Sequence, residues 1–165
     1  MTAQAIPLFP LRTVLFPDGP LPLRVFEPRY LDMISRCMKD DLEFGVVLIT
    51  AGSETGEAQL AQTGTFARIT DWYQGSDGIL GVTGLGTRRF RLDAVDRQPD
   101  GLYVGTVRAL PDLMPQPLPD EYRSLATLLE TIVDDLGLLY EPLPKKYQDA
   151  GWVGARFAEI LPLEL

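Results

Sequence analysis

Five prolines stand among large apolar side chains in residues 9–30, near the start of this 165-residue chain. Proline has no backbone N–H to donate, so it is excluded from the interior of a β-sheet and tolerated at edges, strand starts and turns. The segment is therefore predicted to form two short strands, Ile6 to Phe9 and Leu21 to Val25, joined through a turn at 17–20. The prolines are expected along a bent sheet edge, with the apolar side chains pointing inward.

A helix is predicted directly after this segment. Pro28 suits a first helical turn, and apolar side chains recur at spacings of three and four as far as Met38. Beyond it, runs rich in β-branched and aromatic residues alternate with glycine-containing turns, a pattern typical of strands. The segment from Ala51 to Thr63 has little apolar content and is expected to be a surface loop. Further strands are predicted at 44–50, 65–72, 79–93 and 103–110.

The chain changes character after the last predicted strand. Residues 111–119 contain four prolines and no periodicity, which indicates a stiff connector. Two helical patterns follow, the first on Tyr122, Leu125, Leu129, Ile132 and Leu136, the second on Val153, Phe157, Ile160 and Leu161. We therefore predict a β-rich domain at 1–110, a connector at 111–119 and a helical tail at 120–165. The tail ends on apolar residues and is expected to be shortened or to pack on a partner, and a homodimer is one such arrangement.

The amino-acid composition excludes several kinds of catalytic and metal-binding site. Histidine is absent, so imidazole bases, imidazole metal ligands and Ser-His or Cys-His nucleophiles are excluded. Cys37 is the single cysteine, which excludes an intrachain disulfide and a four-cysteine zinc site. We expect no enzyme activity, no metal and no cofactor. The net charge of −8 opposes nucleic acid and anionic lipid surfaces, so neither is an expected partner.

No segment predicts a membrane span or a secretory signal. The longest apolar run, Val46 to Ile49, is far shorter than the roughly 20 residues that cross a bilayer. The first residues lack a basic region and a continuous apolar region. A cytoplasmic location is the expectation.

Several short motifs in a fixed order carry a family likeness. They are Ile6-Pro-Leu-Phe-Pro-Leu11, Val14-Leu-Phe-Pro17, Leu21-Pro-Leu23, Phe26-Glu-Pro-Arg-Tyr30, Phe44-Gly-Val-Val47, Gly64-Thr65, Ala67-Arg68-Ile69, Gly84-x-Gly86 before Arg89-Phe90, and Tyr103. In this order the chain resembles the amino-terminal substrate-binding domain of the ATP-dependent Lon protease family. The resemblance implies an α+β, mostly β fold: a PUA-like pseudo-barrel of about six or seven strands, one inserted helix and a short carboxy-terminal helical subdomain.

The resemblance also implies a function. Domains of this family help to hold damaged or unfolded proteins for an attached ATPase and protease, and this chain contains no Gly-x-x-x-x-Gly-Lys-Ser/Thr phosphate loop. We therefore expect a stand-alone, non-catalytic module, linked to proteolysis or quality control, that binds exposed apolar segments of unfolded or client proteins. Protease components are a further partner class. Binding is expected to use a shallow apolar groove and backbone groups of a sheet edge.

Three aromatic residues are candidate substrate-binding anchors. Phe16 precedes the turn at 17–20, and Trp72 and Tyr73 precede a glycine-rich turn. Side chains near turns are either core residues or solvent-facing anchors, and the core interpretation is the commoner one for large aromatics.

The motif Phe26, Glu27, Pro28, Arg29 and Tyr30 has two interpretations. An ion pair of Glu27 with Arg29 beside an exposed Tyr30 is suited to grip a peptide. The structural interpretation, which we favour, is that the motif starts the helix, with Glu27 at its positive end and Tyr30 packed beneath the barrel.

An RNA-binding module is the alternative function. Its face would consist of Arg88, Arg89, Arg91 and Arg97, the densest group of cations in the chain. Acidic side chains at 93, 96 and 100 interleave with these arginines, which favours a solvated, self-paired surface.

Overall fold

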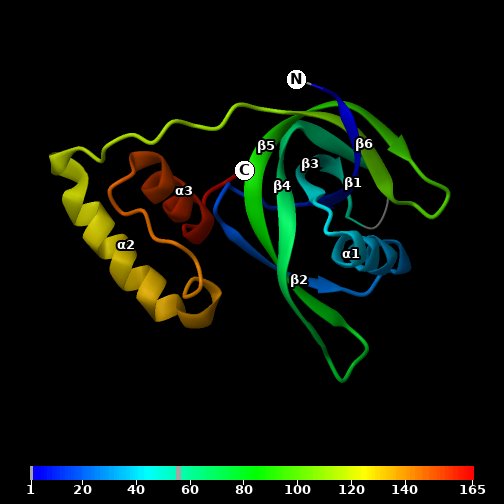
Figure 1. The fold of residues 1–165 in the computed structure, drawn as a ribbon, viewed down its shortest axis with the longest axis horizontal. Coiled ribbons are helices and arrows are strands. Elements are labelled where there is room, and N and C mark those ends of the chain that lie inside the picture. Colours follow the sequence, from blue (N-terminus) through cyan, green and yellow to red (C-terminus); the bar gives the residue numbers. More distant parts are fainter. Residues whose placement is uncertain (1, 55–56) are drawn as a thin grey trace.

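Six strands form one sheet that curls into a partly closed barrel (Figure 1). The computed structural model describes residues 2–54 and 57–165. The strand order is β2-β5-β4-β3-β1-β6, and β6 also pairs with the second half of β5, which joins the two ends of the sheet. The predicted mostly-β architecture with one inserted helix and a helical carboxy-terminal part is confirmed. The strands are β1 Gln4–Leu11, β2 Pro20–Val25, β3 Phe44–Gly52, β4 Ala58–Gln74, β5 Leu80–Arg97 and β6 Tyr103–Ala109.

The prolines of β2 lie where their missing N–H groups cost no hydrogen bond. The N–H of Gly86 donates to the carbonyl of Gly19 at 2.9 Å, and the antiparallel register continues from Pro20 opposite Leu85. Backbone groups of alternate residues face the partner strand, so Pro20 and Pro22 direct theirs away from β5. The predicted proline-lined edge is confirmed for β2, whereas Pro10 lies in the inner strand β1, opposite Val47. The edge of β2 leaves few N–H donors for another strand to pair with.

Helix α1, Pro28–Asp40, covers one end of the barrel and begins at the predicted proline. Its buried face places Met33 and Ile34 in the same apolar cluster as Phe44 and Val82. Each such side chain contributes about 1.5–3 kcal/mol on burial, so the helix and the sheet stabilise one another. Cys37 lies buried on the same face.

One predicted loop is wrong. Residues 51–63 were expected to be a surface loop, but β4 begins at Ala58 and pairs with the end of β3, with Gly52 opposite Ala58. This hairpin is largely exposed, so no apolar alternation marks it in the sequence, and backbone pairing alone defines it. Residues 55–56 of the prediction lie outside the described residues.

The carboxy-terminal part packs two α-helices against each other beside the barrel (Figure 1). The proline-rich segment crosses to them without regular structure, apart from a bridge between Pro117 and Asp149. The division into domains at 110 and 120 stays a prediction. The elements are η1 Asp120–Tyr122, α2 Arg123–Leu136, η2 Gly137–Leu139 and α3 Ala150–Ile160.

The predicted apolar face of α2 is only partly right. Leu129 is fully buried, but its buried neighbours are Ala126 and Val133, which the prediction omitted. Leu125 and Leu136 are exposed. Helix α2 carries apolar residues over more than one face, and contact with α3 selects the face that includes the small alanine.

A buried arginine attaches α3 to the barrel. Arg156 has no exposed surface, and its Nη2 donates to the carbonyl of Pro17 at 2.9 Å and to Glu159 Oε1 at 2.6 Å. Its Nε donates to Glu159 Oε2 at 2.9 Å. Lys146 adds an ion pair to Asp18 at 3.2 Å. The turn that the first prolines create is therefore the docking point for the helical part.

We predict that Arg156→Met lowers the free energy of unfolding by about 3–5 kcal/mol, because it leaves the Glu159 carboxylate buried without its cation. Arg123→Met is the matched control, since Arg123 pairs with Asp120 at the same sequence separation but on the exposed surface. The control should cost at most about 1 kcal/mol. Urea unfolding measures both, and equal losses would contradict the anchoring role of Arg156.

Candidate functional site

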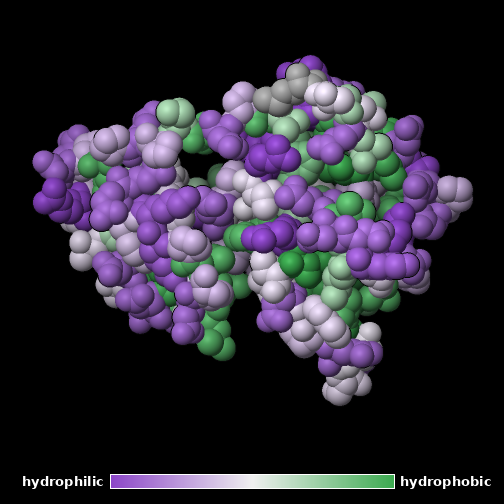
Figure 2. All heavy atoms as spheres, viewed as in Figure 1, coloured by the Kyte–Doolittle hydropathy of each residue, from purple (hydrophilic) through white to green (hydrophobic). Residues whose placement is uncertain are grey.

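A cleft of about 600 Å³ lies between the barrel and the helical part. Figure 2 shows the molecule hollowed between these two parts, beneath the connector. The turn at 16–18 and strand β5 form one wall, α3 forms the opposite wall, and Pro111 to Met114 of the connector border the opening. The cleft depends on the docking of α3 to the barrel, so no single sequence segment contains it.

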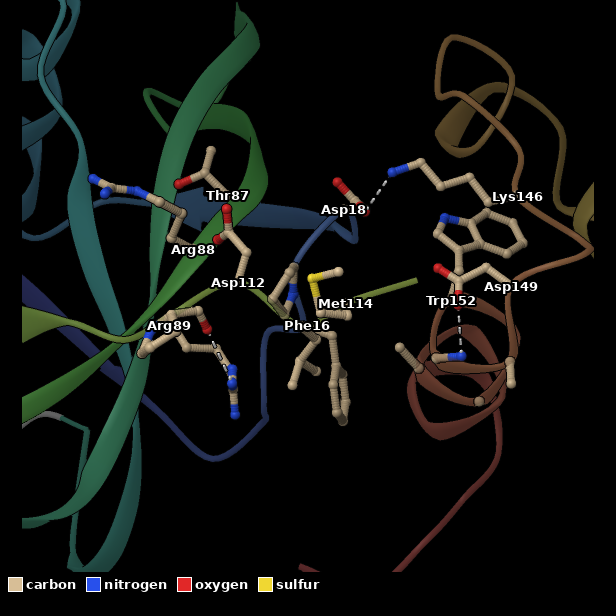
Figure 3. A pocket seen from close by; sticks show the side chains of 17 residues that line it. Phe16, Asp18, Thr87, Arg88, Arg89, Asp112, Met114, Lys146, Asp149 and Trp152 are labelled. Atoms are coloured by element: carbon tan, nitrogen blue, oxygen red, sulfur yellow. Dashed lines mark hydrogen bonds and ion pairs between the residues drawn. The ribbon is translucent and has the colours of Figure 1, made fainter. Parts of the chain in front are cut away.

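Four large apolar side chains face this cleft: Phe16, Leu113, Met114 and Trp152. Met114 is 81% exposed although it is a large apolar residue. Figure 3 shows Phe16 and Met114 side by side, with Trp152 across the space from them. An exposed methionine beside the Phe16 ring is a surface that apolar ligands can cover.

The backbone beside Phe16 is held on two sides. The hydroxyl of Thr65 on β4 donates to the carbonyl of Leu15 at 2.6 Å. Gly86 on β5 lies so close to the carbonyl of Phe16 that a β-carbon at this position would collide with it. The glycine is therefore required for close approach of the turn to the sheet, and it sets the position of the Phe16 ring.

Phe16 also lines a second hollow, of about 250 Å³. Pro17 and Arg89 are shared between the two hollows, and the second one continues over Val14 and Leu48. Phe16 thus stands between two adjoining apolar hollows. Together they form a groove around the turn that is suited to an extended chain.

Seven of the residues that line the cleft are polar or charged, and several of them are paired within the protein. Lys146 pairs with Asp18, and Asp149 accepts from the backbone N–H groups of Gly151 at 3.1 Å and Gln116 at 3.2 Å. The indole Nε1 of Trp152 is buried and meets no acceptor among the described residues. The cleft therefore offers apolar contact from Phe16, Leu113 and Met114 beside these polar groups.

Trp72 and Tyr73 lie elsewhere, near the far end of the β4–β5 hairpin that projects from the barrel (Figure 1). They are 52% and 65% exposed, so the core interpretation is wrong for both. The ring of Tyr73 lies over Gly81 of the paired strand. Neither residue lines the cleft that contains Phe16, so the three candidate anchors form two separate surfaces.

The motif at residues 26–30 ties the start of α1 to two loops. Arg29 is buried; its Nη1 donates to the carbonyl of Gly101 at 2.6 Å and its Nη2 to the carbonyl of Glu54 at 2.9 Å. Tyr30 is also buried, with its ring stacked 4.1 Å from that of Phe9. These contacts agree with the structural interpretation and remove the exposed tyrosine that a peptide grip required.

Phe26 and Glu27 lie at the start of α1, and the position of Glu27 at the positive end of the helix agrees with the structural interpretation. Glu27 occupies the N-cap position of α1, but its carboxylate makes no capping hydrogen bond and pairs with Arg29 at 3.3 Å. Phe26 is 61% exposed and does not line the cleft.

The four arginines of the alternative RNA face are spread along β5. Arg88 lies over the ring of Phe66, whereas Arg97 lies over the ring of Tyr103 and bonds to the carbonyl of Gly101. At about 3.3 Å per residue, these two positions are about 30 Å apart along the strand. Arg89 reaches the carbonyl of Pro111, and Arg91 pairs with Asp93, which also binds Arg108. The arginines therefore do not converge on one point.

Neither a metal centre nor a membrane segment is seen in the parts of the chain that the structure describes. Within residues 2–54 and 57–165 no group of three or more acidic or cysteine side chains converges as metal ligands would. Among the same residues no helix combines the length and apolar character that a bilayer span requires.

The chain combines a curled six-stranded barrel, a helical part and a groove between them, an arrangement suited to a binding domain. The family model of the ATP-dependent protease La (LON) substrate-binding domain matches residues 5–154. The chain belongs to this family, as its motifs predicted. The match runs across both the barrel and the helical part.

Solved structures and individual relatives agree with the family. The Lon N-terminal domain protein from Xanthomonas campestris is 38% identical with a TM-score of 0.77, over 98% of this chain and 85% of that one. The N-terminal domain of a Mycobacterium avium complex Lon protease has a TM-score of 0.54 at 15% identity, over 81% of this chain and 68% of that one, and shows the shared fold alone.

Two curated relatives are much longer than the region they share with this chain. Protein cereblon of Danio rerio is 30% identical over 122 residues, which are 71% of this chain and 28% of cereblon. Lon protease 2 of Myxococcus xanthus is 35% identical over 92 residues, 54% of this chain and 11% of the protease. The chain thus corresponds to a minor part of either protein.

We predict that Tyr30→Phe leaves the stability at pH 7 unchanged or raises it by about 1 kcal/mol, because the Tyr30 hydroxyl is buried without a partner among the described residues. Tyr140→Phe is the control: it removes a hydrogen bond to Glu159 at 3.2 Å and should cost about 0.5–1.5 kcal/mol. A loss at pH 7 in Tyr30→Phe as large as in the control would contradict this assignment.

The same variants test the pH dependence of stability. Burial raises the pKa of Tyr30 to about 12; burial and then the nearby Glu159 carboxylate raise that of Tyr140 to about 12. The unfolded phenols ionise near pH 10, so the stability from each neutral phenol is complete below pH 10 and is lost as pH rises towards 12. Each substitution should make this alkaline decline shallower in chemical unfolding between about pH 9 and 12.

Proposed function

We propose that this protein is a non-catalytic, cytoplasmic module that binds exposed apolar segments of unfolded or client proteins, in a role linked to proteolysis. The observation that carries the proposal is the position of Phe16 between two adjoining apolar hollows. Membership of the Lon substrate-binding family supports a substrate-binding role. The groove is the proposed binding place, and its exposed apolar side chains are the proposed reason for selecting apolar segments.

The groove suits apolar side chains of an extended segment. Its larger hollow, of about 600 Å³, lies within the range of about 300–1,000 Å³ that ligand sites occupy. Phe16 offers rigid aromatic surface, and Met114 offers a flexible chain that adapts to different partners. Such a site takes many sequences, as a receptor for unfolded chains must.

Binding is proposed to rely on side chains more than on a sheet edge. The outer edge of β2 carries Pro20 and Pro22, whose nitrogen atoms have no hydrogen to donate. Backbone pairing by the bound segment is therefore weak at this edge.

The test measures binding of a fluorescently labelled, reduced and carboxymethylated lactalbumin, with the native folded lactalbumin as a negative probe. Phe16→Ala should weaken binding at least about tenfold, since losing a central aromatic anchor commonly costs 2 kcal/mol or more. Phe26→Ala is the matched control, because Phe26 is an exposed phenylalanine outside the groove. Met114→Ser, at an exposed position, repeats the test without disturbing the core.

Circular dichroism establishes that each variant is folded before binding is compared. Failure of the wild-type protein to bind the unfolded probe would overturn the proposal. Equal affinities of the wild-type protein, Phe16→Ala and Met114→Ser would show that the groove is not the site.

A further inference from the structure

Helix α2 exposes a second stripe of large apolar residues, next to the stripe that packs on α3. Leu125, Leu128, Ile132 and Leu136 follow one another at spacings of three and four. The three leucines are 44%, 51% and 46% exposed, and Ile132 is partly buried. Residues at these spacings lie along one side of a helix, so the stripe is continuous over three turns.

This stripe is bordered by acidic side chains. Asp135 lies seven residues after Leu128, on the same side of α2, and Glu121 lies in η1, directly before the helix. Residues 120–141 contain six carboxylates and one cation, Arg123, which pairs with Asp120. The other five carboxylates of this segment form no ion pair with a described residue.

We propose that this face of α2 docks an amphipathic helix of another protein, with an apolar stripe flanked by lysine or arginine. A stripe at spacings of three and four is complementary to the same spacing on a second helix, because side chains of one helix enter the grooves of the other. The carboxylates beside the stripe select basic flanks by charge complementarity. The proposal concerns a partner, and goes beyond the proposed binding of clients.

A second copy of this chain is a poor occupant of the same face. In a two-fold antiparallel pairing centred on Leu128, Glu121 of one copy meets Asp135 of the other. Like charges at such positions oppose association, and the net charge of −8 adds to the repulsion. The same carboxylates that attract a basic helix therefore repel self-association.

The stripe and the groove are separate surfaces. None of the four stripe residues lines either hollow beside Phe16. A partner helix on α2 therefore leaves the groove open, so a client and a partner can be bound together.

Two synthetic helical peptides of about three heptads test the proposal. Both carry leucine at the a and d positions; one has lysine and the other glutamate at e and g. Fluorescence anisotropy in about 0.15 M salt should show binding of the lysine peptide and at least about tenfold weaker binding of the glutamate peptide. Leu128→Ser should weaken binding of the lysine peptide at least tenfold, whereas Leu42→Ser, an exposed leucine on the barrel, should not change it.

Reversing the charge of the acidic residues beside the stripe provides the decisive test. The double variant Glu121→Lys with Asp135→Lys should prefer the glutamate peptide, and both sites are exposed so folding is retained. Equal affinity for the two peptides, or an unchanged preference in the double variant, would overturn the proposal. So would sedimentation showing a wild-type dimer that Leu128→Ser dissociates.

Failure of this inference is distinguishable from failure of the client-binding proposal. Phe16→Ala should still bind the lysine peptide but bind the unfolded lactalbumin more weakly. Leu128→Ser should still bind the unfolded lactalbumin but bind the lysine peptide more weakly. A variant that loses both would show that the two surfaces are not independent, against the arrangement described here.

Discussion

The buried guanidinium of Arg156 is the interaction on which the rest of the arrangement depends. A fully desolvated cation is costly unless it is paired and hydrogen-bonded, and its partners come from two parts of the molecule. Glu159 supplies the charge from the same helix, and the carbonyl of Pro17 supplies an acceptor from the barrel. Because Phe16 precedes Pro17, one contact both holds the helical part in place and fixes the wall of the groove.

The early prolines give the barrel an edge that resists pairing while leaving its apolar side chains in place. Pro20 and Pro22 remove donors from the outer side of β2, and Leu21 and Leu23 still fill the core between them. This combination suits the proposed client-binding role. Unpaired sheet edges recruit extended polypeptides and lead to aggregation, whereas a side-chain groove can hold and release them.

The family likeness, the strands and the helices could be read from local patterns, because each depends on residues close together in the chain. The site could be read only in part. Phe16 was recognised beside its turn, but Met114 and Trp152 lie almost 100 residues or more away and carry no motif. The hairpin at 58–63 was missed because both of its faces are largely exposed, so no apolar period marks it.

The sequence by itself determined which chemistry is absent, where the chain bends and which family it belongs to, since composition, proline positions and short motifs need no partner to be read. Tertiary structure decided which of two apolar faces of α2 is buried, that Trp72 and Tyr73 face solvent, and that a groove exists at all. The physical reason is that burial is a property of contacts between elements. Two helices with the same pattern bury different faces when their neighbours differ.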